Sequence, residues 1–365
     1  MVKRSGADPS LLRRLNVAAV IRSLYETDEL TLTELVNASE LSRPTVEEIA
    51  ADLQSQGLIE EVVPDADAPR PVGRPAKRFR FRAGAGHLAG VDIGPHKILC
   101  LVSDLRGKIV ASARADVTPS MSATERLAAA KSLVARTARG RSRLWAAGVG
   151  TTGVVSAGKV VISDRLPNWQ GVDLVAGLGA GKSYPVFAGN DTKLATLAEH
   201  WRGAARDADD VVYLLIGRSI SLGLLLGGKL HAGYNGAAGE IGVLRDVGWY
   251  TALDRVREYG AEKLFDAARQ GDSEANAIVA AFVADLATGV AATVLTVDPQ
   301  LVVIGGGLSQ AGSMLAEPLH AELARLCLFP VRVETSVLGD ESVALGAVRL
   351  ALDHVTTELF SVVEH

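Results

Sequence analysis

The strongest chemical signal in the sequence is a basic segment between residues 70 and 82, which no acidic residue interrupts. Its cationic side chains are Arg70, Arg74, Lys77, Arg78, Arg80 and Arg82. Guanidinium and ammonium groups gathered on one short segment are suited to contacting the phosphates of nucleic acid. The chain as a whole carries a net charge of −4, so we expect any such contact to come from this local surface and not from the overall field.

The residues on either side of this segment indicate the element that presents it. Residues 58–63 and 78–82 alternate apolar and polar side chains, which is typical of strands. We therefore predict a hairpin whose basic loop is a wing, with Arg74 near its tip. Because narrow A·T minor grooves attract arginine, Arg74 is predicted to enter the minor groove, and Lys77 and Arg78 are predicted to lie near phosphates.

Three helical patterns precede the wing, at residues 10–25, 31–38 and 42–57. Thr31 followed three residues later by Glu34 forms a capping-box pattern, which predicts the start of the second helix. Ser42 is a suitable N-cap for the third helix, because Pro44 follows it in the first turn. Three helices with a tight turn between the second and the third predict a helix-turn-helix.

In a helix-turn-helix, the first residues of the recognition helix enter the major groove. Here these residues are Ser42, Arg43 and Thr45, which we predict to read bases, with Glu48 as a further candidate. Double-stranded operator DNA is therefore the predicted partner of residues 1–84. The alternative is that the three helices form a docking or dimerisation module and that the basic segment is a solvated face.

The remainder of the chain, residues 85–365, is predicted to be a separate body. The small-residue stretch AGAGHLAG follows the basic segment, and such stretches mark hinges. A chain of 365 residues, 48% of them hydrophobic, can bury more than one core. The strongest apolar runs, VVYLLIG and LVVIGGG, have the length of strands, so we predict no membrane span and a cytoplasmic location.

The pattern of the body predicts an α/β fold with two lobes. Hairpins alternate with strand–helix units, and this layout occurs twice, from residue 88 and again from residue 211. We predict a first lobe at about 85–189, completed by a C-terminal helix at 342–360, and a second lobe at about 190–341. Two similar lobes are expected to enclose a cleft.

Five segments of the body carry a resemblance to a known family. In order, they read VDIGPHKI, GVGTTGVVSAGKVVISDRLPNWQGVDL, GNDTKLATLAEHWRGA, GYNGAAGEIGVL and LVVIGGGLSQAG. Together with a Gly73-Arg74-Pro75 wing, they resemble the ROK family, which contains repressors and sugar kinases of the actin-like ATPase superfamily. The resemblance covers essentially the whole chain. It implies an N-terminal winged helix-turn-helix followed by a two-lobed, ribonuclease H-like domain of the sugar-kinase type.

The resemblance also implies which side chains would hold a sugar. Asn168 would contact a sugar hydroxyl, Asn190 and Asp191 would lie at the floor of the cleft, and Glu240 would accept hydrogen bonds from hydroxyl groups. Asp191 stands at the position of the general base in the kinases, a role that requires a carboxylate within hydrogen-bond reach. From the residues alone, Asn190 and Asp191 also fit an ordinary helix N-cap after a strand.

Departures from the family pattern argue against catalysis. The first phosphate loop has Pro95 and His96 where the kinases have Gly-Thr, and proline removes a backbone donor. In the second loop Arg218 follows Gly217, and a bulky side chain there opposes close approach of the backbone to phosphate. We therefore predict that the protein is not an enzyme and needs no cofactor, while Arg218 leaves a phosphorylated ligand open.

The zinc site of the family is not expected here. Val243 stands at the position of its histidine, and residues 244–256 contain no cysteine. Trp249 and Tyr250 lie in the same segment. They are predicted either to fill the space left by the metal knuckle or to offer an aromatic platform on which a sugar stacks.

The overall prediction is a DNA-binding transcriptional regulator, with repression as the expected sign. The body is predicted to form a homodimer or a dimer of dimers, and to sense a sugar or sugar phosphate through a shift between two states. Two alternatives stay open. One is a regulator that binds DNA constitutively with no small-molecule effector, and the other is an active ATP-dependent sugar kinase with an added DNA-binding domain.

Overall fold

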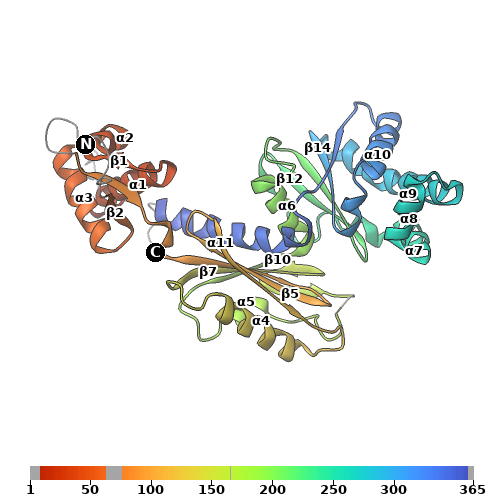
Figure 1. Cartoon of the computed structure of the whole chain (residues 1–365), viewed down its shortest axis with the longest axis horizontal. Helices are drawn as coiled ribbons and strands as arrows, with labels where there is room; N and C mark the ends of the chain where they lie inside the picture. The colour runs from red at the N-terminus through yellow and green to blue at the C-terminus, as the bar shows by residue number, and fades with distance from the viewer. Residues whose placement is uncertain (1–8, 63–75, 165, 361–365) are drawn as a thin grey trace, which may run out of the picture.

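The computed structural model describes residues 9–62, 76–164 and 166–360 of the chain. These residues form a small helical domain at one end and two larger α/β lobes, one of which lies at the opposite end (Figure 1). A long C-terminal helix runs between the parts. The α/β, two-lobed fold class predicted from the sequence is therefore confirmed.

The N-terminal domain is a helix-turn-helix with a small sheet. Its helices are α1 (Pro9–Glu26), α2 (Leu32–Ser39) and α3 (Arg43–Ser55), and its strands, in sheet order, are β1 (Leu30–Thr31), β3 (Arg78–Phe81) and β2 (Ile59–Val62). Thr31 caps α2 in a capping box with Glu34, and Ser42 caps α3, both as predicted. Strands β2 and β3 pair antiparallel, which confirms the predicted hairpin. The wing loop between them, including Arg70 and Arg74, lies outside the described residues.

The first lobe is built on a five-stranded sheet in the order β10-β7-β4-β5-β6. Its helices α4 and α5 pack against the sheet, and a separate hairpin, β8–β9, follows β7. The elements are β4 (His87–Ile93), β5 (Lys97–Asp104), β6 (Ile109–Asp116), α4 (Ala123–Thr137), β7 (Leu144–Thr151), β8 (Val154–Ser156), β9 (Lys159–Ile162), α5 (Leu174–Gly179) and β10 (Val186–Asn190).

The second lobe repeats this topology with a five-stranded sheet in the order β13-β12-β11-β14-β15. In both sheets the first strand pairs antiparallel with the second and parallel with the fourth, so the predicted repeat of the layout is confirmed. The elements are β11 (Val211–Ile216), β12 (Ile220–Leu226), β13 (Lys229–Leu230), α7 (Trp249–Tyr259), α8 (Ala261–Arg269), α9 (Ser273–Val297), β14 (Leu301–Gly305), α10 (Ser313–Leu326) and β15 (Arg332–Thr335). Short 3-10 turns lie at Ala83–Ala85, Ile241–Val243, Arg245–Val247, Gly307–Ala311 and Gly339–Glu341.

Helix α9 corrects one expectation. The strongest apolar runs are not limited to strand length, because residues 273–297 form a single helix whose length and composition would suffice to cross a membrane. Half of its most apolar window is buried within the protein, where Phe282, Leu286 and Val290 belong to the core of the second lobe. The core helix of a soluble protein passes the same test of length and composition.

Two helices connect the lobes: α6 (Asp191–Arg202) follows β10, and α11 (Ser342–Phe360) ends the described chain. Helix α11 packs against α6, β7 and β4. The packing is close enough to require glycine, since a Cβ added at Gly148 would lie 2.0 Å from the carbonyl oxygen of Ala347, and one at Gly346 would lie 1.8 Å from that of Leu194. These contacts fix α11 against the first lobe.

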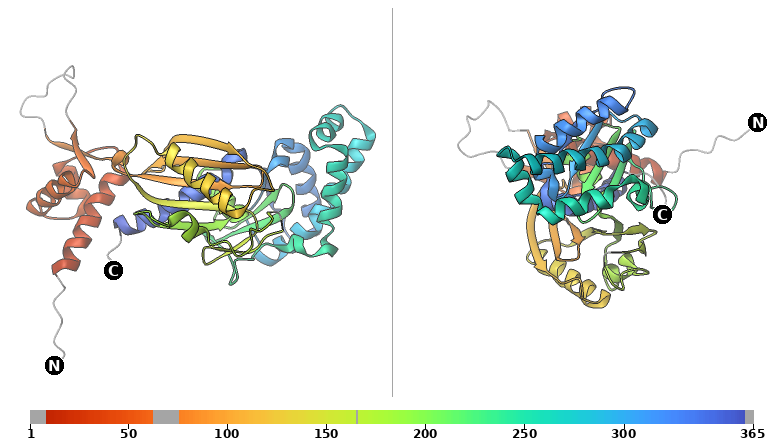
Figure 2. Two further views of the ribbon diagram at one scale, coloured as in Figure 1. Left: turned by 90° about the horizontal axis from the view of Figure 1, so that it is seen from below. Right: turned by 90° about the vertical axis from the view of Figure 1, so that its right-hand side faces the viewer.

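The helix-turn-helix is joined to the body by a shared hydrophobic core. Leu24 of α1 lies in the same buried cluster as Leu105 of the first lobe and Val355 of α11. At its edge, Tyr25 stacks edge-to-face on Phe360 with ring centroids 5.2 Å apart, and its hydroxyl donates a 3.0 Å hydrogen bond to the carbonyl oxygen of Leu105. Figure 2 shows α11 extending from this junction along the first lobe. The helix-turn-helix is therefore packed on the body rather than joined to it only by a linker.

Candidate functional site

The exposed start of α3 presents the side chains that the sequence predicts to read bases. Ser42 and Arg43 are exposed, and Thr45 is half-buried. The hydroxyl oxygens of Ser42 and Thr45 lie 2.8 Å apart, and the Arg43 Nε donates to the Glu47 carboxylate at 3.0 Å. All three side chains therefore lie at one end of the helix, the end that a helix-turn-helix inserts into the major groove.

The described basic residues at the base of the wing are each paired with a carboxylate. Lys77 Nζ lies 2.9 Å from a Glu61 oxygen, and Arg78 Nε lies 2.8 Å from a Glu29 oxygen. Exposed pairs of this kind contribute only about 0–1 kcal/mol each, so phosphate groups can replace the carboxylates at little cost. Both cations can therefore exchange a carboxylate for another anion.

A pocket of about 190 Å³ brings together three of the four residues predicted to hold a sugar: Asn190, Asp191 and Glu240. We call it the acidic pocket. It also contains Asp164 and Ser221, which were not among the predicted ligand residues, and Tyr250, one of the two aromatic residues considered as a sugar platform. Its lining comes from both lobes, including Ile162 at the end of β9 and Ile220 at the start of β12, which confirms the expectation of a cleft.

Asn190 caps helix α6, as one of the two predictions for this pair has it, and both Asn190 and Asp191 line the acidic pocket. The Asn190 carboxamide oxygen accepts the N–H of Lys193 at 3.1 Å, which makes Asn190 the N-cap of α6, and its Nδ2 donates to the Gly153 carbonyl at 2.8 Å. The Asp191 Oδ1 accepts hydrogen bonds from Asn190 Nδ2 at 2.9 Å and from the Thr192 N–H at 2.7 Å. Among the described residues no hydrogen bond reaches its Oδ2, which leaves that oxygen to a ligand.

Burial sets the protonation of the acidic pocket. It raises the pKa of Asp191 to about 6, an effect to which the Glu240 carboxylate adds and which the Thr192 hydrogen bonds reduce. Burial also raises the pKa of Glu240, whereas the buried ammonium group of Lys193, 3.8 Å from the Glu240 Oε1, lowers it. Lys193 thus offsets part of the negative charge of the pocket from behind its wall.

Asn168, the fourth predicted residue, is exposed and does not line the acidic pocket among the described residues. Its backbone is left-handed, with φ of 56°, a conformation that asparagine tolerates. The next residue, Trp169, is buried and donates from Nε1 to the Thr151 hydroxyl at 3.0 Å, which anchors the loop. Asp164 lines the pocket from the same loop, and its position just after the end of a strand was the signal for it in the sequence.

A second pocket, of about 320 Å³, adjoins the acidic pocket and shares Asp191 and Ser219 with it. We call it the Pro95 pocket, because Pro95 and His96 line it together with Arg218. These are the residues at which the sequence departs from the kinase pattern. The buried Asp92 also lies here, and desolvation raises its pKa to about 7.

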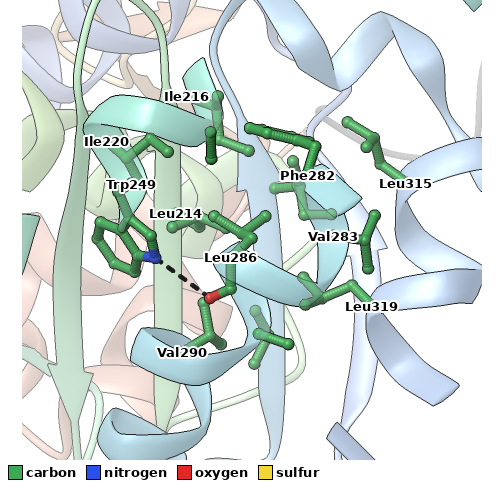
Figure 3. Packing of buried hydrophobic residues seen from close by; sticks show 14 of the residues in the cluster. Leu214, Ile216, Ile220, Trp249, Phe282, Val283, Leu286, Val290, Leu315 and Leu319 are labelled. Atoms are coloured by element: carbon green, nitrogen blue, oxygen red, sulfur yellow. Dashed lines mark hydrogen bonds between the residues drawn. The ribbon is translucent and has the colours of Figure 1, made fainter. Parts of the chain in front are cut away.

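Trp249 and Tyr250, neighbours at the start of α7, have opposite environments. Trp249 is buried in the core of the second lobe, where its Nε1 donates to the Leu286 carbonyl at 3.3 Å (Figure 3). A Cβ added at Gly289 would lie 2.6 Å from its ring, so α9 carries glycine there to make room. Tyr250 is 46% exposed and lines the acidic pocket. Trp249 therefore fills the core, whereas Tyr250 lies at the wall of the pocket.

Comparison with known proteins bears on both parts of the chain. Residues 88–245 and 249–354 match the model of the ROK family, and residues 15–62 match that of the IclR helix-turn-helix domain. The chain is 21% identical to a xylose repressor from Caldicellulosiruptor bescii, over 94% of this chain and 96% of that protein. It is 30% identical to a glucokinase from Thermotoga maritima, over 57% of this chain and 79% of that enzyme.

A solved structure supports the same arrangement of domains. The chain superposes on a ROK family transcriptional regulator, described as a homolog of the Escherichia coli MLC protein, with a TM-score of 0.73 over 96% of this chain and 98% of that chain, at 18% sequence identity. The kinase-like body, the helix-turn-helix ahead of it and the family match agree with one another. The chain belongs to the ROK family, in which it has the domain organisation of a DNA-binding transcriptional regulator.

Proposed function

We propose that this protein is a transcriptional repressor that binds double-stranded operator DNA and is controlled by a sugar or sugar phosphate. The observation that carries the proposal is the shared core of α1, α11 and the first lobe, which couples a helix-turn-helix to a body with a cleft pocket. In this proposal residues 1–84 bind DNA and residues 85–365 form the sensing body, located in the cytoplasm. Similarity to a protein named as a xylose repressor supports both the sign of regulation and the class of effector.

The proposed contacts follow from the geometry. Ser42, Arg43 and Thr45 would read bases from the start of α3, while Lys77 and Arg78 would exchange their carboxylate partners for phosphates. Arg74, outside the described residues, is proposed to enter the minor groove from the wing. In the body, Asn190, Asp191 and Glu240 would hold the effector, and Asn168 would join them only if its loop moved.

Selection of duplexes from a random pool tests the DNA-binding function and identifies the operator sequence at the same time. We expect enrichment of a palindrome, because a homodimer or dimer of dimers presents two recognition helices related by two-fold symmetry. The half-sites should be separated by about 10–10.5 base pairs or a multiple of this spacing. A pool that shows no enriched sequence after repeated rounds would contradict the proposal.

Sugar kinase activity is the competing function, and the Asp191 carboxyl in the cleft together with the glucokinase relative favours it. We propose that activity is absent because Pro95 offers no N–H to a phosphate and Arg218 places bulk in the second loop. In an ADP-release assay with glucose and ATP, the rate is expected to equal that of the protein-free control. Turnover that disappears in Asp191→Asn would show that the body is a kinase.

The affinity for the effector is expected to depend on pH through Asp191. Its pKa of about 6 means that Asp191 is ionised above about pH 6 and becomes neutral below it. A carboxylate accepts hydrogen bonds from hydroxyl groups more strongly than a neutral carboxyl does, so sugar affinity should fall as the pH is lowered from 8 to 5. Calorimetric titration at constant ionic strength measures this, and Asp191→Asn should flatten the curve. Affinity that rises towards pH 5 would be the opposite result.

A further inference from the structure

Tyr250 is placed as a ligand-contacting residue rather than as part of the core. It is the second residue of α7, and the burial of Trp249 immediately before it fixes where the helix begins. Its side chain is 46% exposed and lines the acidic pocket. Among the described residues it has no aromatic partner and no side-chain hydrogen bond. An aromatic ring held at a pocket wall without a protein partner is available to stack on a ligand.

The rest of the lining has the two kinds of surface that a sugar requires. Ile162 and Val243 extend the apolar surface around Tyr250, while Asp191 and Glu240 provide carboxyl groups. A pyranose ring has one face of C–H groups, which packs on aromatic and aliphatic side chains, and an equatorial rim of hydroxyls, which donates to carboxylates. The pocket therefore offers an apolar surface for the C–H face of a sugar and carboxyl groups for its hydroxyls, within about 190 Å³.

The charge of the pocket favours neutral sugars over anionic ones. Three acidic residues line it, Asp164, Asp191 and Glu240, and no lysine or arginine is among the described lining residues. The three carboxyls influence one another, since Asp164 raises the pKa of Glu240 and Glu240 raises that of Asp191. A carboxylate or phosphate on the ligand would add a further negative charge to this partly buried cluster.

Nearby cations do not change this conclusion. Lys193 is buried behind the wall beside Glu240, and Lys97, Arg114 and Arg218 line the adjoining Pro95 pocket instead. None of these residues is among the described side chains that line the acidic pocket. An anionic group on a ligand held within the acidic pocket would therefore meet carboxyl groups and no cation of the described lining.

We propose that Tyr250 is the stacking platform of the acidic pocket and that this pocket takes an uncharged sugar. The inference rests on the proposed function, which makes the pocket a sugar sensor, and it narrows the effector from sugars and sugar phosphates to neutral sugars. It also makes Tyr250 a residue that determines specificity, with Trp249 fixing its position.

Calorimetric titration of the full-length protein without DNA tests the inference directly. The probes are glucose and xylose as neutral sugars, and glucuronate and glucose 6-phosphate as anionic ones. We expect a neutral sugar to bind at least tenfold more tightly than either anion. Tyr250→Ala should weaken its binding about tenfold, which corresponds to about 1.4 kcal/mol, whereas Tyr250→Phe, which keeps the ring, should retain most of the affinity. Phe329→Ala is the matched control, because Phe329 is 70% exposed and outside the pocket lining.

Three results would overturn the inference. If the wild type and Tyr250→Ala bind the neutral sugar with equal affinity, Tyr250 is not a stacking platform. If glucuronate or glucose 6-phosphate binds more tightly than the neutral sugars, the pocket does not prefer an uncharged ligand. Absence of binding by all four probes would also reject it, together with the sensing part of the proposed function. None of these results affects selection of an operator by the helix-turn-helix. Calorimetry therefore tests the inference, and selection from the random pool tests DNA binding independently of it.

Discussion

Replacing Trp249 by alanine is expected to destabilise the second lobe by about 3–5 kcal/mol, the range for removing a fully buried tryptophan. Trp249 is 2% exposed, lies in the main core of the lobe, and donates its Nε1 hydrogen to the Leu286 carbonyl (Figure 3). Truncation leaves a cavity beside Gly289. Glycine stands at this position because a side chain there would collide with the indole ring. Urea unfolding followed by far-UV circular dichroism measures the loss, since the variant also removes a tryptophan fluorophore.

The neighbouring Tyr250→Ala variant is the control for this prediction. Its side chain is half-exposed and contributes little packing, so the free energy of unfolding should change by less than about 0.5 kcal/mol. A loss below about 1 kcal/mol for Trp249→Ala would contradict its assignment as the residue that fills this core. Together the two variants separate the aromatic residue that fills the core from the one proposed to contact the ligand.

The second large effect is expected on DNA recognition. Arg43→Ala should weaken binding to the selected duplex by about tenfold to a hundredfold, because a bidentate arginine–guanine contact discriminates by about 1–3 kcal/mol. The exposed ion pair with Glu47 must open first, which costs at most about 1 kcal/mol. Fluorescence anisotropy at fixed salt on the selected and on an unrelated duplex gives both affinities.

The pattern across the two duplexes identifies the role of Arg43. A loss confined to the selected duplex indicates base reading, whereas equal losses on both would make Arg43 a phosphate contact. Arg325→Ala is a suitable control, since Arg325 is an exposed arginine paired with Glu322 on α10 of the second lobe. Unchanged affinity of Arg43→Ala for the selected duplex would rule out its proposed part in recognition.

Much of the fold was predictable because its signals are local. Thr31 and Ser42 cap their helices through contacts with residues three positions along the chain, and such spacings are visible in a sequence. The matching strand order of the two lobes follows from hairpins and strand–helix units that occur twice.

The candidate site was only partly predictable from the sequence. Which residues line the pocket depends on the direction in which each side chain points, and the sequence does not show this direction. Asn190 ends strand β10 and Asp191 begins helix α6 at the cleft, where both line the same pocket as Glu240. Asp164 rather than Asn168 lines the pocket, since the buried Trp169 holds the loop with Asn168 at the surface. Trp249 and Tyr250 differ by one position on a helix, a rotation of about 100° that sends one side chain to the core and the other to the pocket.

Control of DNA binding by the acidic pocket requires coupling between the body and the helix-turn-helix through their shared core. Only a ligand that binds the two states with different affinities can shift DNA binding. The most direct test is the anisotropy of the selected duplex titrated with the wild-type protein, with and without saturating neutral sugar, beside Asp191→Asn. We predict that the sugar weakens operator binding of the wild type at least fivefold and leaves the variant unchanged. An operator affinity that no sugar alters, in a protein that binds the sugar, would show that the pocket does not control DNA binding.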